Sequence, residues 1–188
     1  MCKVPARPEV HPALATRFSP VAFDPDTTVS TGQVDTLLDA ARRAPSAGNS
    51  QPWMFIVAHR GDGVHRRIVP HLARSSTAWV PDASLLVVNL AQVYVEGTTD
   101  WEYSEFSRYD LGQAVAHMII QGLSVGLDAH QFRAFDRDAI AAEFEVQPHF
   151  EVTSMTAFGL AAHAAGELSA PGTSRERASI DEITWARE

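Results

Sequence analysis

The sequence predicts one domain in which a four-stranded β-sheet carries helices on its faces. The chain has 188 residues, enough for a sizeable core within one domain. Apolar residues make up 45% of it and charged residues 20%, as in ordinary globular proteins. Four short strand-like segments are interspersed with stretches of helical periodicity, and the two patterns together predict a sheet with helical layers.

The N-terminal quarter is predicted to hold two helices separated by an irregular segment. A short helix is expected over residues 12–17, whereas the prolines of RFSPVAFDPDTTVS resist helix formation. Ser30, followed three residues later by Gln33, forms a capping box that marks a helix start. Apolar residues then recur at helical spacing, which predicts a helix over about 31–44 that Pro45 ends.

Four short segments are predicted to be strands, of which residues 53–58 are continuously apolar. A continuous apolar run of four to eight residues is typical of a buried strand. The predicted strands cover residues 53–58, 84–90, 128–132 and 151–158.

Three further helices are predicted between and after these strands. Asp62 can cap a helix over 63–74, in which Pro70 is expected to introduce a kink. The helix over 108–126 has a broad apolar stripe, so we expect it to be central or at an interface. Asp136 can cap the last helix, which is expected to run through Glu145.

Two segments show no regular period. Residues 96–106, EGTTDWEYSEF, are acidic and aromatic, and we interpret them as a loop or lid. The chain from Gly159 is rich in Ala, Gly, Ser and Pro and then polar. A long polar tail rarely packs on its own domain, so residues 160–188 are expected to extend to a partner subunit.

Composition argues against several classes of partner. The formal net charge is −8, and an acidic chain repels phosphate backbones, so no nucleic-acid partner is expected. No apolar run approaches the length of a membrane span, and MCKVPARPEV has no signal-peptide core. Cys2 is the only cysteine, which fits a cytoplasmic protein. The histidines show no metal-ligand spacing, so no metal site is expected.

The stretch APSAGNSQPW, residues 44–53, is small, polar and uncharged. It joins a predicted helix to a predicted strand, so rigid elements hold it in place. Its hydroxyl and amide groups suit the edge of a planar heteroaromatic ring with alternating N–H and C=O groups. A simple turn is the alternative interpretation.

The order of several motifs resembles that of the nitroreductase family of flavin (FMN) oxidoreductases. These motifs are RFSPVAF, APSAGNSQPW with the strand after it, STAWVPDASLLVV, and RYDLGQAVAHMIIQGLSVGLDAHQFRAFD. The resemblance extends from about His11 to the C-terminal RERASIDEI. It implies an α+β fold with a central, mostly antiparallel sheet of four strands, to which the partner chain can add a fifth. It also implies a homodimer with FMN sites at the interface, each built from both chains.

The resemblance assigns roles to individual residues. Arg17 and Ser19 match residues that hold the FMN phosphate and ribityl chain, and the planar fork of arginine suits phosphate. The residues that match the loop contacting the isoalloxazine ring, usually from the partner subunit, are Pro45, Ser46, Ala47, Asn49 and, in support, Gln51. Arg175 or Arg177 matches a basic pair that closes on the phosphate. The alternative interpretation for each of these residues is that it is only a surface cation or a turn residue without a binding role.

The implied chemistry is that of the cofactor. Hydride passes from NADH or NADPH to the flavin, the nicotinamide leaves, and a small-molecule acceptor takes its place. Nitroaromatics, quinones, enones and biosynthetic intermediates stay open as acceptors, as does a dehydrogenase running in the oxidative direction. No catalytic acid–base set is expected. The alternative function is a flavin-binding protein with little turnover, which stores or sequesters FMN or acts as a non-catalytic partner.

Two positions depart from the family pattern. Val21 stands where the first motif carries a cation. Arg133 and Ala134 stand where many relatives carry a glycine whose backbone N–H meets the flavin N5, and both are expected to contact the cofactor. Ala134 keeps the N–H but not the freedom of glycine at positive φ. Arg133 places a cation close to where the substrate stacks, and the alternative is that it points to solvent.

Overall fold

The fold is built around one antiparallel sheet. The computed structural model describes residues 9–168 and 174–187. The strands are β1 (Trp53–His59), β2 (Leu85–Gln92), β3 (Asp128–Phe132) and β4 (Phe150–Gly159). They lie in the order β1-β2-β4-β3, and every neighbouring pair is antiparallel. The predicted four strands and their mostly antiparallel arrangement are therefore confirmed.

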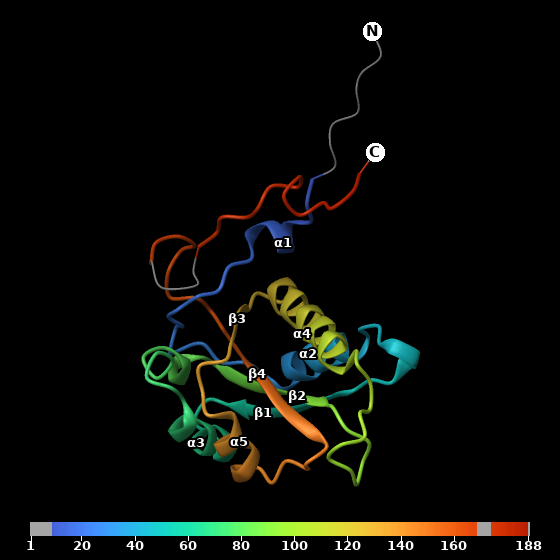
Figure 1. The fold of residues 1–188 in the computed structure, drawn as a ribbon. Helices are drawn as coiled ribbons and strands as arrows, with labels where there is room; N and C mark the ends of the chain where they lie inside the picture. The colour runs from blue at the N-terminus through green and yellow to red at the C-terminus, as the bar shows by residue number, and fades with distance from the viewer. Residues whose placement is uncertain (1–8, 169–173, 188) are drawn as a thin grey trace.

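Helices cover both faces of this sheet (Figure 1). The two on one face are α2 (Thr31–Arg42) and α4 (Ser107–Ser124), and the two on the other are α3 (Gly63–Ile68) and α5 (Arg137–Glu143). The short α1 (Pro12–Thr16) lies outside these layers, near one end of α4. Single 3-10 turns occur at Ala47–Asn49, Val69–His71 and Val80–Asp82. The α+β class is thus confirmed.

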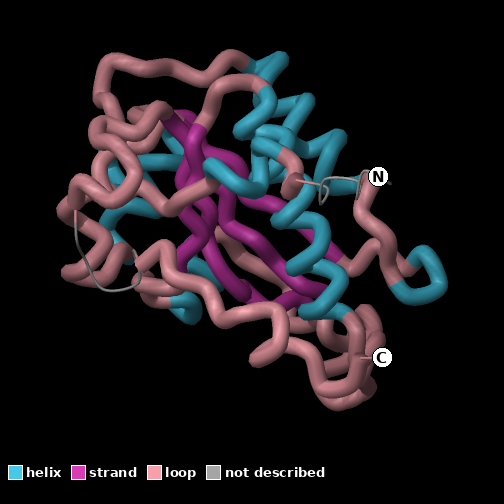
Figure 2. The backbone as a smooth tube through the Cα atoms, turned by 90° about the horizontal axis from the view of Figure 1, so that it is seen from above, coloured by secondary structure: helices cyan, strands magenta, loops and turns pink. Residues whose placement is uncertain are grey.

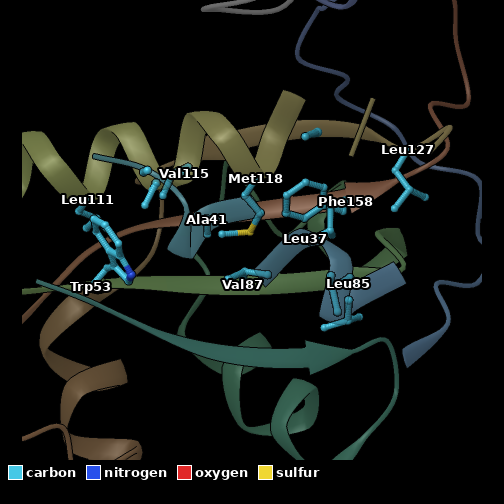
Figure 3. Packing of buried hydrophobic residues seen from close by; sticks show 14 of the residues in the cluster. Leu37, Ala41, Trp53, Leu85, Val87, Leu111, Val115, Met118, Leu127 and Phe158 are labelled. Atoms are coloured by element: carbon cyan, nitrogen blue, oxygen red, sulfur yellow. The ribbon is translucent and has the colours of Figure 1, made fainter. Parts of the chain in front are cut away.

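Alternate side chains of β2 enter two separate cores. Leu85 and Val87 pack with α2 and α4, as Figure 3 shows, whereas Leu86 and Val88 pack on the side of α3 and α5. All four side chains are almost completely buried. A strand covered on both faces has no polar side to alternate with, which is why residues 85–88 are all apolar.

The long helix α4 is central, as its apolar stripe predicts. It packs against α2 and lies across β1, β2 and β3. Leu111, Val115 and Met118 point from it into the core above the sheet (Figure 3). Gly126 follows the helix at a φ of 80°, a left-handed conformation that glycine adopts without strain.

The predicted helix caps are confirmed, but the helix after Asp62 is much shorter than expected. Ser30 and Gln33 make both hydrogen bonds of the capping box, and the Asp62 carboxylate accepts from the His65 N–H at 2.7 Å. The helix expected over 63–74 ends at Ile68 and continues as one 3-10 turn. Pro70 has no N–H to donate, and inside an α-helix its ring clashes with an earlier carbonyl, so it ends the helix rather than kinking it.

The two irregular segments have different surroundings. The predicted loop over 96–106 has no helix or strand. It is tied back by an isolated bridge between Tyr94 and Glu102 and by hydrogen bonds from Tyr103 to the carbonyl oxygens of Val93 and Ser50. The C-terminal segment first lies beside residues 22–24, and its part from residue 174 then runs beside α1, away from the sheet (Figures 1 and 2). Its Ile183 and Trp185 side chains are exposed, the latter completely. Within the described ranges no helix is long and apolar enough to cross a membrane.

Candidate functional site

The predicted phosphate-binding residues line a cavity beside α4. The cavity has a volume of about 360 Å³ and lies between α4, β3 and the N-terminal segment. Its lining residues are Leu14, Arg17, Ser19, Ala116, Ile119, Ile120, Ala129 and Gln131. Arg17 and Ser19 are half-buried, and the guanidinium donates to the Ser19 hydroxyl oxygen at 3.4 Å. The cavity therefore combines one polar end with an apolar wall.

The two C-terminal arginines gather at that polar end. Arg175 donates to the backbone carbonyl oxygens of Ala15 and Thr16, at 3.0 and 3.3 Å, directly before Arg17. Burial lowers the pKa of Arg17, and the positive charges of Arg177 and Arg175 lower it further. In the part of the chain that the structure describes, none of these three arginines forms an ion pair with a carboxylate. Three uncompensated cations at one place favour a bound anion.

The polar loop over residues 44–53 is fixed by its own hydrogen bonds. The Ser46 hydroxyl accepts from the Gln51 N–H at 3.0 Å, and the Gln51 amide donates to the Asn49 carbonyl at 3.3 Å. The N–H of Ala47 donates to the buried carboxylate of Asp110 on α4 at 2.9 Å. The Gln113 amide approaches the Pro45 carbonyl at 3.5 Å. Both ends of the loop's 3-10 turn are thus tied down.

The loop backbone is held in a conformation that most residues avoid. Gly48, Asn49 and Gln51 have φ values of 60°, 57° and 48°, all in the left-handed region. Asparagine tolerates this region and glutamine does so less well, so the segment is locally strained. Such strain persists where the surrounding structure imposes it, and it is frequent at functional sites. Asn49 and Gln51 are also exposed.

The loop and the arginine cluster contact different parts of α4. The loop is held by Asp110 and Gln113, whereas the cavity at Arg17 is lined by Ala116 and Ile119. Residues 110 and 119 are separated by about 14 Å along a helix. In the described residues the two groups share no cavity wall, so the structure does not bring them together within one chain.

Arg133 and Ala134 lie next to a second cavity. Arg133 is exposed but lines a space of about 360 Å³ between α4, β3 and β4. The other lining residues are Arg108, Leu111, Gly112, Gln131, Phe132, Thr153 and Ser154. Gln131 lines this cavity and the one at Arg17, so the two are neighbours along β3. Ala134 is half-buried, and its carbonyl accepts from the Ala73 N–H at 3.0 Å.

Two histidines hold the segment that follows Arg17. The Val21 N–H donates to Nε2 of His163 at 3.1 Å, so position 21 contributes its backbone where the family motif has a cation. The His130 ring lies on Trp79 with centroids 4.4 Å apart, and its Nδ1–H donates to the Pro20 carbonyl at 2.7 Å. Burial is the main cause that lowers the pKa of His130, and a neutral ring results.

Sequence reasoning missed two residues at these sites. Asp110 is a buried acid near the start of the long apolar helix, and its place four residues before Ala114 of the apolar stripe was the available signal. Gln131 belongs to no short motif, and only the pairing of β3 with β4 places it between the two cavities. Among the described residues there is no group of three or more His, Cys, Asp or Glu side chains that could hold a metal ion.

Comparison with known proteins decides the family. The model of the nitroreductase family matches residues 14–160, most of the chain. The chain belongs to the nitroreductase family. This membership agrees with the sheet, its helical layers and the position of the polar loop.

Two solved structures resemble this nitroreductase-family chain over most of its length, and one curated relative resembles it over a short segment. A solved structure of an oxidoreductase containing FMN is 28% identical, with a TM-score of 0.76 over 84% of this chain and 80% of the other. A nitroreductase-like protein of Streptococcus mutans is 20% identical, with a TM-score of 0.76 over 94% and 97% of the two chains. The oxygen-insensitive NAD(P)H nitroreductase of Salmonella typhimurium is 40% identical over 50 residues, 27% of this chain and 23% of that relative.

Proposed function

We propose that the protein is an FMN-dependent oxidoreductase that passes hydride from NADH or NADPH to a small organic acceptor. The observation that carries this proposal is Arg17, which lines a largely apolar cavity beside the Ser19 hydroxyl and has the charges of Arg175 and Arg177 near it. A phosphate group would compensate these charges, because arginine forks bind phosphate through paired charged hydrogen bonds. The FMN-containing oxidoreductase of similar fold supports the choice of ligand.

The rest of the cavity suits the remainder of such a cofactor. Ala116, Ile119 and Ile120 form an apolar wall from α4, and Gln131 offers polar amide groups along β3. Arg17 and Ser19 would hold the phosphate, and the wall would exclude water from an aromatic ring placed along it. FMN, when bound, accepts and donates hydride, whereas the protein supplies binding, orientation and electrostatics.

We propose that each site is completed by a second copy of the chain. The polar loop around Asn49 is exposed, strained and remote from the arginine cluster along α4. In a homodimer, the loop of one subunit can offer its neutral donors and acceptors to a ring held by the other. The exposed apolar residues of the C-terminal segment, such as Trp185, also favour a partner surface.

Anaerobic reduction tests this function. The protein is loaded with FMN and mixed with NADH or NADPH in the absence of oxygen. An oxidoreductase bleaches the flavin absorbance at about 450 nm, and an added acceptor restores it. If FMN binds but neither donor bleaches it, the protein is instead a flavin-binding protein with little turnover. If FMN does not bind, the protein is neither an FMN-dependent oxidoreductase nor a flavin-binding protein.

A further inference from the structure

The segment that carries Arg17 and Ser19 is held by side chains rather than by its own backbone. Within the described ranges, residues 18–21 make no hydrogen bond between backbone groups. The N–H of Val21 donates instead to Nε2 of the His163 ring at 3.1 Å. Because backbone pairing does not fix this segment, contacts such as this one set its position.

The His163 ring contacts the segment at two points. Besides accepting from Val21, it lies edge-on to Phe18, with ring centroids 5.6 Å apart and an angle of 74° between the planes. Phe18 stands between Arg17 and Ser19 in the chain, so the two contacts lie on either side of Ser19. Moving the ring would therefore move both side chains that we assign to the FMN phosphate.

The backbone around His163 is itself fixed, so the ring has a defined position. The Ala161 N–H donates to the Asp128 carboxylate at 2.9 Å, and the Ala164 N–H donates to the Glu167 carboxylate at 2.8 Å. Asp128 is the first residue of β3, which ties this part of the chain to the sheet. The ring thus connects a fixed part of the domain to the segment of the phosphate site.

Two hydrogen bonds define the protonation of the His163 ring. An N–H group can donate only to a ring nitrogen without a proton, so Nε2 carries none. Nδ1 lies 3.0 Å from the Ala164 carbonyl oxygen, to which it donates its proton. The ring is therefore neutral. A proton added at Nε2 would point at the Val21 N–H, and the hydrogen bond between them would be lost.

His130 holds the same segment, but its hydrogen bond survives protonation. Its Nδ1–H donates to the Pro20 carbonyl oxygen at 2.7 Å. Both nitrogens of a protonated imidazole are donors, so a second proton on this ring leaves the donor in place. The contact of His163 depends on an acceptor instead, so acid breaks this contact and spares the one made by His130.

We propose that His163 is a positioning residue of the cofactor site, whose neutral ring keeps Arg17 and Ser19 in place and whose protonation weakens FMN binding. Histidine changes its charge between about pH 5 and 8. The charged and titratable groups around this ring and segment are Arg17, Asp24, Asp128, His130 and Glu167. Within the described ranges none of them forms an ion pair with the ring, so no carboxylate holds the protonated form in place. The inference rests on the proposed function, because it concerns the phosphate end of that site.

FMN titration between about pH 5.5 and 8 tests this role in the wild type, His163→Gln and His163→Phe. Glutamine places a carbonyl acceptor at the distance of Nε2 and does not titrate, whereas phenylalanine keeps the ring against Phe18 without an acceptor. On acidification the Kd of the wild type should rise about three- to tenfold more than that of His163→Gln, the effect of losing one neutral hydrogen bond. His163→Phe should bind FMN about three- to tenfold more weakly already at neutral pH.

The comparison between variants separates His163 from other groups that titrate. The phosphate of FMN gains a proton at about pH 6, but this change is common to all the proteins. His149→Gln is the control, because His149 is a half-buried histidine beside Phe150, at the opposite end of β4 from His163. It should keep the pH dependence of the wild type. Equal pH dependence in the wild type and His163→Gln would overturn the proposal, as would wild-type affinity of His163→Phe at neutral pH.

Amide exchange at Val21 tests the hydrogen bond without FMN. NMR gives the exchange rate of this N–H in the wild type and in His163→Gln at each pH. The residues next to Val21 in the chain are the same in both proteins, so the intrinsic exchange rates cancel in the ratio. The ratio of wild type to variant should rise as the pH falls, and if it does so while FMN fails to bind, only the proposed function fails. A ratio that does not change with pH contradicts the role of His163, whatever FMN does.

Discussion

The carboxylate of Asp110 on α4 accepts a hydrogen bond from the backbone N–H of Ala47 at 2.9 Å. Its other oxygen accepts from the Gln113 amide at 3.2 Å, and the residue is 2% exposed. One buried acid in the central helix therefore fixes the polar loop that we propose to meet the flavin of the partner subunit. The loop depends on this hydrogen bond because its exposed residues make few other hydrogen bonds to the rest of the domain.

Replacing Asp110 by alanine should destabilise the fold and weaken FMN binding. The Ala47 N–H loses its acceptor, and a lost hydrogen bond to a charged group costs about 1.5–3 kcal/mol. Urea unfolding measures the stability, and FMN titration measures the affinity. Asp39→Ala is the control, because Asp39 makes only exposed ion pairs with neighbouring arginines on its own helix. Equal behaviour of the two variants would contradict the role given to Asp110.

Removing the guanidinium of Arg17 should weaken FMN binding by about 1.5–3 kcal/mol, the usual range for a hydrogen bond to a charged group. Val21→Arg, which restores the cation of the family motif, should leave the affinity unchanged or raise it. Arg74→Ala is a matched control, because Arg74 is exposed and lines neither cavity. FMN titration of Arg17→Ala with wild-type affinity would place the phosphate elsewhere.

His130 should make the stability of the protein fall in acid. Burial lowers its pKa in the folded state below the ordinary value of 6.5, so the unfolded chain takes up the proton first. The neutral His130 ring contributes its full share of the unfolding free energy above pH 6.5. This share is lost as the pH falls from there through the pKa of His130 in the folded state. His130→Asn keeps an N–H donor for Pro20 and should reduce the pH dependence of the unfolding free energy.

The contribution of His130 is measured by comparing how steeply the unfolding free energy depends on pH in the wild type and in His130→Asn. His65 is also buried, and its lowered pKa acts in the same direction, so the wild-type slope alone does not identify the residue. Urea unfolding at several pH values between neutral and mildly acidic gives the slope for the wild type and for His130→Asn. Identical slopes would show that His130 does not contribute.

Deleting residues 174–188 should weaken both dimer formation and FMN binding. The deletion removes Arg175 and Arg177 from the proposed phosphate site, together with the exposed Trp185. Light scattering measures the oligomeric state, and flavin absorbance measures the FMN content. The full-length double variant Arg175→Ala/Arg177→Ala is the control, because it should lose flavin affinity but remain dimeric. A truncated chain that is still dimeric and saturated with FMN would refute this role of the tail.

Local signals predicted the elements of this fold well. The capping box at Ser30 and Gln33 gave the start of α2, and the apolar stripe from Leu111 to Leu123 gave α4 almost to its ends. The strand order β1-β2-β4-β3 has no local signal, because it depends on pairings between distant segments. For the same reason the sequence did not predict that Asn89 and Ser154 meet through the pairing of β2 with β4.

The candidate site was only partly predictable. The resemblance gave Arg17 and either Arg175 or Arg177 as parts of one phosphate site, and the structure places the Arg175 guanidinium on the backbone carbonyls just before Arg17. It gave no role to Gln131, whose importance arises from its position between two cavities. The ending of α3 at Ile68 shows a further limit, since a proline can kink or end a helix.

A mixed dimer tests most directly whether each FMN site is built from two chains. One chain carries Arg17→Ala, and the other carries Asn49→Gly, which removes the amide but tolerates the φ of 57° at that position. The two chains bear different tags, are co-expressed, and the mixed dimer is purified through both tags. The FMN content per dimer is then compared with that of each variant homodimer.

If Arg17 and Asn49 of opposite chains meet at one flavin, the mixed dimer contains one intact site and one doubly altered site. It should bind one FMN per dimer with wild-type affinity, whereas both variant homodimers bind it weakly. If each site instead uses residues of a single chain, both sites of the mixed dimer are damaged. A mixed dimer that binds FMN no better than the two homodimers would therefore contradict the account.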